Sequence, residues 1–346
     1  MNIIYAIAGE GMGHATRSRP IIAHLTKKHN VRVFAGGKAL PYLRRFFNVS
    51  WLGSAHIVYR NNAVMEGRTV LLNIVRLPLY VVSFLKMLFI MLFQRPDILV
   101  TDYEPWSCWT ALLTGVPVVS IDNENVITRA KLSLPRHHRA DFIKAWMVTM
   151  FFIPSARATI IPSFFFPPLK DPRAKYVNPV IRPEIAGRKP TDKGHVLVYQ
   201  TSQTNLRLLD TLKRFPKQQF IVYGFPREGQ DANLLFKRFS EHGFFSDLAS
   251  AKAVIANGGF SLLSEAVYLR KPVLSVPVIR QCEQIINAHY LEKLGYGVMA
   301  HEATVGVIRK FLAGLHRQRQ ALKKRHLWHL QSLFTTIEKV LHNVTE

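Results

Sequence analysis

The sequence contains almost no cysteine. Cys108 and Cys282 are the only two, they lie far apart, and neither belongs to a Cys–x–x–Cys pair. Disulfide frameworks and zinc sites need closely spaced cysteines, often together with histidines. We therefore expect two reduced thiols, no metal site and a protein of the reducing cytoplasm.

Acidic residues are scarce as well. The 22 aspartates and glutamates face 46 lysines and arginines, so the formal net charge is +24. This excess predicts an anionic partner, such as a phosphate-bearing substrate or an acidic membrane surface. Nucleic acid is not expected, because no recognisable binding module or stripe of basic and aromatic residues accompanies the charge.

No uninterrupted apolar run reaches the roughly 18–20 residues of a membrane-spanning helix. The longest tract, residues 70–93, is broken by Arg76, Pro78 and Lys86. Its apolar residues lie on nearly all sides of a helix, unlike those of an ordinary surface helix. Two interpretations stay open. The tract is either a buried helix that covers a sheet or, with the aromatic segment 142–154, a segment at a bilayer interface.

Short apolar runs alternate with helical patterns in both halves of the chain, which indicates βαβ units and parallel sheets. A proline-rich segment, residues 166–193, divides the halves, because its prolines exclude a long helix. We predict an α/β protein of two Rossmann-like domains that face a cleft: 1–165, with the candidate membrane segment 70–93, and 194–325, before a helix at 326–346. The strands are expected at residues 3–8, 31–35, 97–101, 118–121, 159–161, 195–200, 220–223, 253–256 and 273–276.

The stretch GEGMGHATRSRP, residues 9–20, follows the first expected strand. A dinucleotide site needs G-x-G-x-x-G and an acid after the second strand. Here the glycines are spaced by two, and the second strand runs into two further glycines, so no dinucleotide cofactor is expected. Gly11 and Gly13 would let backbone N–H groups approach an anion at a helix N-terminus. The helix terminus would lower the pKa of His14 and keep it a neutral base; alternatively, His14 only caps its own loop.

Asp102 stands at the end of another expected strand, where ligand-binding residues of open parallel sheets belong. A carboxylate at this place could hold His14 in one tautomer. The alternative is a turn or helix-capping aspartate. Glu104 makes an Asp–x–Glu pair with it, but no further metal ligand is near in the sequence.

The second half carries the more specific pattern, residues 254–297. A strand ends in a glycine turn, a serine-bearing helix follows, and a buried strand KPVLSVP precedes a polar run CEQIINA. A polar cluster also follows the strand at 195–200. The candidate binding residues are Ser202, Asn257, Gly258, Gly259, Ser261, Ser264, Glu265, Glu283, Gln284 and Asn287.

This ordered set resembles the donor half of GT-B glycosyltransferases, in particular the UDP-glycosyltransferases and the N-acetylglucosaminyltransferase that completes the peptidoglycan lipid precursor. GEGMGHATRSRP, with Arg17, is similar to the acceptor-side loop of the same families. The resemblance implies a C-terminal helix that crosses back to the first domain and an activity without metal or cofactor. It implies that Ser202, Asn257, Gly258, Gly259 and Ser261 meet the diphosphate, that Glu265 binds the ribose, and that Glu283 and Gln284 bind the sugar. Many relatives have histidine where Asn257 stands.

The resemblance therefore implies an inverting transfer from a nucleotide-sugar, with UDP as the expected nucleotide, to an acceptor hydroxyl that His14, oriented by Asp102, deprotonates. A lipid-linked acceptor of the cell envelope and peripheral attachment to the cytoplasmic face of the inner membrane would suit the charge and the tract 70–93. Two alternatives remain: a UDP-sugar 2-epimerase of the same fold, and a non-catalytic membrane-docked protein that binds sugar-nucleotide or lipid. The sugar, the nucleotide base and the acceptor stay undetermined.

Overall fold

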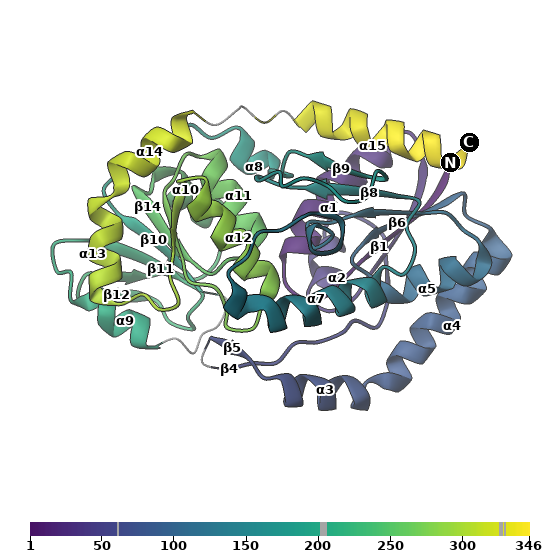
Figure 1. The fold of residues 1–346 in the computed structure, drawn as a ribbon, viewed down its shortest axis with the longest axis horizontal. Helices are drawn as coiled ribbons and strands as arrows, with labels where there is room; N and C mark the ends of the chain where they lie inside the picture. The colour runs from purple at the N-terminus through teal and green to yellow at the C-terminus, as the bar shows by residue number, and fades with distance from the viewer. Residues whose placement is uncertain (61, 201–205, 325–327, 329) are drawn as a thin grey trace. The chain divides into compact units, whose positions relative to one another are not determined.

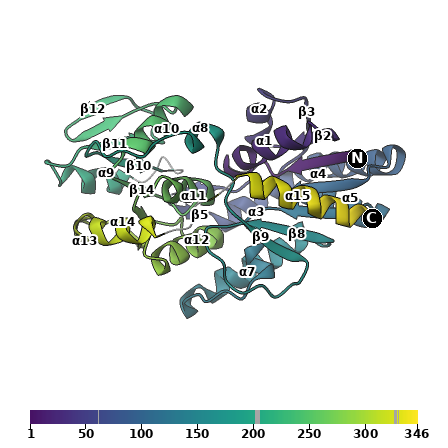
Figure 2. The same ribbon diagram turned by 90° about the horizontal axis from the view of Figure 1, so that it is seen from above.

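A computed structural model describes residues 1–60, 62–200, 206–324, 328 and 330–346. The chain forms two compact units (Figures 1 and 2). The first contains residues 1–58, 65–180 and the C-terminal helix, and the second contains residues 59–64 and 181–328. The chain therefore passes between the units more than once.

The first unit is built on a seven-stranded sheet in which all strands are parallel. The crossover connections carry helices, as a parallel sheet requires. In spatial order the strands are β3 (Val49–Trp51), β2 (Asn30–Ala35), β1 (Asn2–Ile7), β6 (Ile98–Asp102), β7 (Val118–Ile121), β8 (Ala158–Pro162) and β9 (Ala174–Val177). The helices are α1 (Gly13–Leu25), α2 (Ala39–Leu43), α3 (Glu66–Val75), α4 (Leu77–Gln94), α5 (Pro105–Thr114), α6 (Val126–Arg129), a 3-10 turn (Arg136–His138), α7 (Arg139–Phe152) and α15 (Leu330–Thr345).

The second unit has a sheet of seven strands as well, parallel except for its β12–β13 edge. In spatial order the strands are β12 (Gly229–Asp231), β13 (Leu234–Phe236), β11 (Phe220–Tyr223), β10 (Val196–Tyr199), β14 (Ala253–Ala256), β15 (Val273–Ser275) and β16 (Gly297–Met299). Its helices are α8 (Pro183–Ala186), α9 (Leu206–Lys213), α10 (Glu241–Ser250), α11 (Phe260–Tyr268), α12 (Cys282–Lys293), α13 (Val305–Ala313) and α14 (Leu315–Lys323). The predicted α/β class with two parallel-sheet units is confirmed.

A short hairpin from the first half of the sequence belongs to the second unit. Its strands are β4 (Tyr59–Arg60) and β5 (Ala63–Val64). Asn62 and Val64 exchange backbone hydrogen bonds with Ile279, so the hairpin is fixed to the loop after β15. Nothing in the sequence pattern had indicated this insertion.

The C-terminal helix α15 packs within the first unit, beside β8 and β9 (Figure 1). Its buried face joins the same core as Ile3 and Ile22 of β1 and α1. On the polar side, the Glu338 carboxylate lies 2.8 Å from His24 Nε2 and 3.0 Å from His29 Nε2. The residues just before it, 325–327, lie outside the described part of the chain.

The proline-rich segment 166–193 is not a simple connection. It contains β9, which extends the first sheet, and the short helix α8. The first unit ends at Val180 and the second resumes at Ile181. Extended pieces separated by prolines are what let this segment serve both units.

The apolar tract forms two helices, α3 and α4, which meet at Arg76. Pro78 lies in the first turn of α4, where a missing N–H costs nothing. The 18 residues of α4 are long and apolar enough to cross a membrane by length and composition, and 28% of them are buried. The sequence, interrupted at Arg76, Pro78 and Lys86, had predicted no apolar run long enough to span a membrane. Met87 and Met91 pack into the core beneath the sheet, whereas the opposite face of α4 is exposed.

Prediction for the C-terminal helix. Ile337 is fully buried in the core of the first unit. We expect Ile337→Ala to lower the free energy of unfolding by about 2–5 kcal/mol, because it removes buried methyl groups and leaves a cavity. Urea unfolding followed by tryptophan fluorescence measures this change. The control Ile74→Ala makes the same substitution at a side chain that is 61% exposed. Equal effects of the two substitutions would show that α15 does not contribute to the core.

Candidate active site

His14 lies at the start of α1, which begins at Gly13. The preceding loop folds tightly: Gly11 has a φ of +77°, which favours glycine, and a Cβ on Gly9 would come within 2.4 Å of Gly36. Gly13 occupies the first helical position. The side chain of His14 is 12% exposed.

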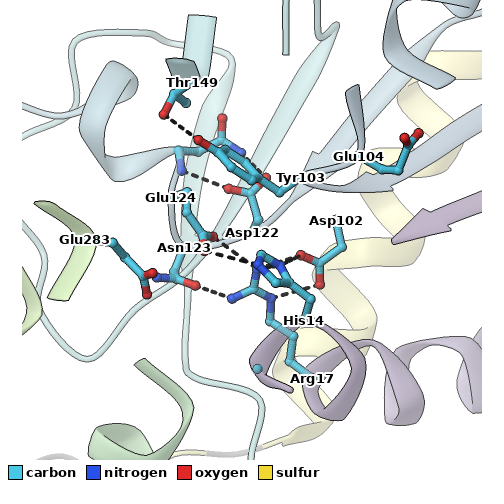
Figure 3. A network of polar contacts seen from close by, with 12 residues as sticks. His14, Arg17, Asp102, Tyr103, Glu104, Asp122, Asn123, Glu124, Thr149 and Glu283 are labelled. Atoms are coloured by element: carbon cyan, nitrogen blue, oxygen red, sulfur yellow. Dashed lines mark hydrogen bonds and ion pairs between the residues drawn. The ribbon is translucent and has the colours of Figure 1, made fainter. Parts of the chain in front are cut away.

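Asp102 is the last residue of β6, and its side chain is completely buried. Its Oδ1 lies 2.7 Å from His14 Nδ1, so the predicted contact between these two residues is present (Figure 3). Ser18 donates its hydroxyl to Oδ2 at 2.8 Å. Because the carboxylate only accepts, the Asp102 contact requires a proton on Nδ1, which leaves Nε2 as the acceptor of the neutral ring. Arg17 Nη2, which only donates, lies 2.8 Å from the same Nδ1, so we assign the tautomer from the shorter Asp102 contact.

Arg17 holds the same carboxylate from a second side. Its Nε donates to Asp102 Oδ2 at 2.8 Å and its Nη2 to Oδ1 at 2.5 Å. This paired geometry is the strong form of an arginine–carboxylate contact. At 4% exposure Arg17 is buried; its Nη1 donates to Asn123 Oδ1, and its Nη2 also contacts Glu124 Oε2. Sequence reasoning had placed Arg17 on the acceptor-side loop without this partner.

The segment Asp122–Asn125, between β7 and α6, also contributes to the site, although the sequence pattern had not indicated it. All four of its side chains are buried. Asp122 closes the turn by accepting from the backbone N–H of Asn125 at 2.8 Å. Glu124 faces the histidine: its Oε1 lies 3.6 Å from His14 Nε2. The sequence signal that could have found it is its position, directly after the strand next to β6.

The electrostatics of this cluster correct one expectation. Burial alone lowers the pKa of His14, and Arg17 acts in the same direction. The carboxylates of Glu124 and Asp102 outweigh both, so the pKa of His14 is raised rather than lowered. Burial opposes the charge of Asp102 too, but Arg17 and His14 hold its pKa at about 2. Asp102 is therefore ionised at every physiological pH.

Tyr103 positions the histidine ring. It follows β6 directly and has a φ of +59°, which is uncommon for a residue with a side chain. Its ring stacks on His14 at 6.1 Å between centroids, and its hydroxyl is 2.9 Å from Thr149 Oγ1. Such a backbone conformation at a site usually persists because the surroundings require the side chain there. Glu104, in contrast, caps α5: its carboxylate accepts from the N–H groups of Trp106 and Ser107 and from the Ser107 hydroxyl.

In the second unit, the predicted glycine turn follows β14 and is tied to α12. The Gly258 N–H donates to Gln284 Oε1 at 3.1 Å, and Asn287 Nδ2 donates to the Gly258 carbonyl at 3.1 Å. A Cβ on Gly258 would come within 2.3 Å of the Gln284 carbonyl, so glycine is required. Asn287 also reaches Glu283 Oε1 at 3.2 Å. Four of the predicted residues, with Asn257 next to them in sequence, are thus brought together.

Other predicted donor residues have different surroundings. Glu265 is 1% exposed, and both of its oxygens accept from Arg182 at 2.6 Å, with the guanidinium 4.3 Å above the Phe245 ring. Ser261 lies in the first turn of α11, whereas Ser264 is buried one turn further along. Ser202 lies outside the described residues.

The two polar sites lie at the carboxyl ends of parallel strands, where open α/β sheets bind ligands. The first combines an oriented imidazole with a buried carboxylate, an arrangement able to accept a proton. The second has a glycine turn before α11, and the N-cap residue of this helix, Gly259, has no side chain that could cap it. Such a terminus suits an anion. Among the described residues, no group of three or more His, Cys, Asp or Glu could hold a metal ion.

Two parallel-sheet units with these sites define the GT-B class of glycosyltransferase folds. Solved structures with similar folds include the spinosyn forosaminyltransferase SpnP (17% identity, TM-score 0.67, 99% of each chain) and MurG of Acinetobacter baumannii (15% identity, TM-score 0.59, 97% of this chain and 99% of that one). Another is Phytolacca americana UGT2, solved with UDP-2-fluoro-glucose and pterostilbene (14% identity, TM-score 0.67, 99% and 98%). No curated protein sequence matches.

A family model described as Glycosyl transferase family 1 matches residues 1–316. The chain belongs to this family and is a glycosyltransferase. The resemblance drawn from the two sequence motifs is thereby confirmed.

Prediction for the histidine. Glu124→Gln removes the charge that raises the pKa of His14 most, so that pKa should fall. An NMR titration of the imidazole resonances measures it in wild type and variant, and the wild-type value should lie above the ordinary 6.5. Glu66→Gln, at a 43% exposed carboxylate paired with Lys144, is the matched control and should leave it unchanged. A wild-type value below 6.5 would contradict this electrostatic account.

Proposed function

We propose that the chain transfers a sugar from a nucleotide-sugar, with UDP as its nucleotide, to an acceptor hydroxyl with inversion at the anomeric carbon. The observation that carries the proposal is the His14–Asp102 contact of 2.7 Å at the end of β6. It gives the ring one proton on Nδ1 and an acceptor at Nε2. Family membership supports the transfer of a sugar and leaves its stereochemistry to be tested.

His14 acts as the base in this proposal. Nε2 takes the proton of the acceptor hydroxyl while that oxygen attacks the anomeric carbon. The bond from this carbon to the diphosphate oxygen breaks, and the nucleotide diphosphate leaves with the electron pair. Asp102 and Arg17 stay charged throughout; Asp102 stabilises the imidazolium that forms. Attack from the face opposite the leaving group inverts the centre.

The second unit binds the donor. The α11 N-terminus and the adjoining Gly259 supply partial positive charge to the diphosphate. Glu283, on the first turn of α12, is the residue we assign to the sugar. Gln284 is committed to Gly258 and Val278, so we assign it to the shape of the turn. Arg182 donates to both carboxylate oxygens of Glu265, so a ribose hydroxyl would have to share these oxygens with the guanidinium.

Prediction for the base. His14→Ala should lower kcat by at least 100-fold, because general base catalysis contributes about 10²–10⁴-fold. Its affinity for UDP should stay within twofold of wild type, since the donor is assigned to the other unit. Chromatography of product after incubation with UDP-sugar and acceptor measures the rate, and calorimetry measures the affinity. His242→Ala, on α10, is the control. Full activity of His14→Ala would contradict the assignment, and conversion of the donor sugar without any acceptor would indicate an epimerase instead.

We propose further that the acceptor is lipid-linked and that the protein attaches peripherally to the cytoplasmic membrane face. An exposed apolar surface on the first unit supports this. Most of α7 is exposed, and Thr149 is its only buried residue. The residues of this apolar surface, all at least 36% exposed, are Val70, Leu71, Ile74, Val75, Leu85, Phe89, Leu92, Phe93, Ile143, Trp146, Met147, Met150 and Phe151.

The helices that carry the apolar surface adjoin one another within the first unit. α4 packs on α5, the Trp109 indole N–H donates to the Phe151 carbonyl at 2.9 Å, and Lys144 of α7 pairs with Glu66 of α3 at 2.8 Å. Monomeric soluble proteins seldom expose so many large apolar side chains together. Exposed arginines, among them Arg68 and Arg139, flank them. Apolar faces with cationic flanks suit an anionic bilayer interface better than a neutral partner.

Prediction for the membrane. The protein should sediment with vesicles of phosphatidylcholine and phosphatidylglycerol, and less so at high salt. The double variant Phe89→Glu/Phe93→Glu should abolish sedimentation. It replaces two apolar side chains, 58% and 71% exposed, with carboxylates that an anionic bilayer repels. The control Phe166→Glu/Phe239→Glu adds the same charge at 55% and 54% exposed positions and should sediment like wild type.

Three results would contradict the membrane proposal. The protein could fail to sediment while it self-associates through the apolar surface. It could resist extraction by alkaline carbonate, as an integral protein does. Both double variants could lose sedimentation equally, which would attribute binding to net charge alone.

A further inference from the structure

Three side-chain amides meet in the second unit. Gln200 follows β10, Asn257 follows the adjacent β14, and Asn62 comes from the hairpin that the first half of the chain contributes. They are 1%, 3% and 8% exposed. Because β10 and β14 are parallel neighbours, the cluster lies at the carboxyl edge of the sheet, beside the glycine turn.

The amide hydrogens of Asn257 are committed to the protein. Its Nδ2 donates to the Val276 carbonyl at 3.0 Å and to Asn62 Oδ1 at 3.1 Å, with Gln200 Oε1 at 3.4 Å as a third, longer contact. The two amide hydrogens of Asn257 therefore have three protein acceptors within reach. The Asn62 amide is itself held by the Pro277 carbonyl at 3.3 Å, so the hairpin fixes the orientation of Asn257.

The amide hydrogens of Gln200 are not committed. Its Nε2 is buried and has no hydrogen-bond partner anywhere in the described residues. A buried donor without a partner is rare and calls for an explanation. Among the three side-chain nitrogens of the amide cluster, Gln200 Nε2 is therefore the one with no partner in the described residues, and it is the donor we assign to a ligand.

The backbone of Gln200 is held in place independently of its side chain. Its N–H lies 3.4 Å from the Tyr223 carbonyl. Gly224, with a φ of +93°, passes so close that a Cβ there would lie 2.1 Å from the Gln200 carbonyl. The unpartnered amide is thus presented from a fixed position at the strand end, as a preorganised binding group must be.

We propose that Gln200, rather than Asn257, supplies the side-chain donor to the diphosphate of the nucleotide-sugar. This inference rests on the proposed function, since it assigns a residue to the same donor. The ligand group must be an acceptor, because the part of the Gln200 amide without a partner is its Nε2 donor. The neighbouring α11 N-terminus begins at a glycine N-cap and adds positive potential, so a phosphate oxygen fits better than a sugar hydroxyl. Asn62 is a positioning residue that keeps Asn257 turned toward the protein.

Calorimetric titration with UDP and with uridine tests the proposal. Gln200→Leu should weaken UDP binding at least tenfold and leave uridine binding within twofold, because only the phosphate contact is lost. Gln318→Leu is the matched control: Gln318 is 7% exposed, lies on α14, and its Oε1 likewise lacks a partner. It should bind both compounds like wild type.

Thermal unfolding without ligand adds a second readout. Gln200→Leu should unfold at or above the wild-type temperature, because the substitution removes a buried donor that has no partner. If Gln200→Leu does not fold, Gln200→Glu keeps the size and the Oε1 acceptor, and its negative charge should weaken UDP binding by more than tenfold.

Unchanged UDP affinity in both Gln200 variants overturns the proposal while leaving the transfer reaction intact. Unchanged UDP affinity with weaker binding of the UDP-sugar overturns the diphosphate assignment in favour of a sugar contact. A wild-type protein that neither binds UDP nor transfers sugar refutes the proposed function, and this inference with it.

Discussion

The buried ion pair between Arg17 and Asp102 is the interaction on which the first site depends. A carboxylate with no exposure is stable inside a protein only when it is paired and hydrogen-bonded, and Asp102 accepts from Arg17, His14 and Ser18 together. All three partners lie on α1, so the same hydrogen bonds hold this helix against strand β6. Removing Arg17 would leave a buried charge uncompensated, and the orientation of the imidazole would be lost with it.

The same cluster sets the protonation of His14. One permanent cation, Arg17, is surrounded by Asp102, Asp122 and Glu124, so the local potential is negative despite the net charge of +24. Burial raises the pKa of Asp122, and the repulsion from Glu124 adds to this increase. The helix terminus that was expected to favour a neutral histidine is outweighed by carboxylates at shorter range. The histidine of this positively charged protein is therefore surrounded by negative charge, which suits proton uptake from a hydroxyl.

Much of the fold could be predicted because parallel strands are short apolar runs that periodicity detects; β1, β2, β7, β11 and β14 lie within a residue or so of expectation. The His14–Asp102 contact followed from one rule, that strand ends at one sheet edge converge. Glu124 and the hairpin with Asn62 could not be found this way, because tertiary packing alone brings them to their sites. Gln200 was visible only as part of a polar cluster, since whether an amide has a partner is not a property of sequence.

The central claim is that His14, held by Asp102 and Arg17 and raised in pKa by Glu124, is the base of the transfer. The pH dependence of kcat/KM tests it most directly, because it reports the ionisation of the free enzyme. The protonated imidazole cannot accept the hydroxyl proton, so kcat/KM should fall on the acid side with a midpoint above 6.5, and this midpoint should move to lower pH in Glu124→Gln. An acid limb centred below 6.5, or one that Glu124→Gln leaves in place, would contradict the account.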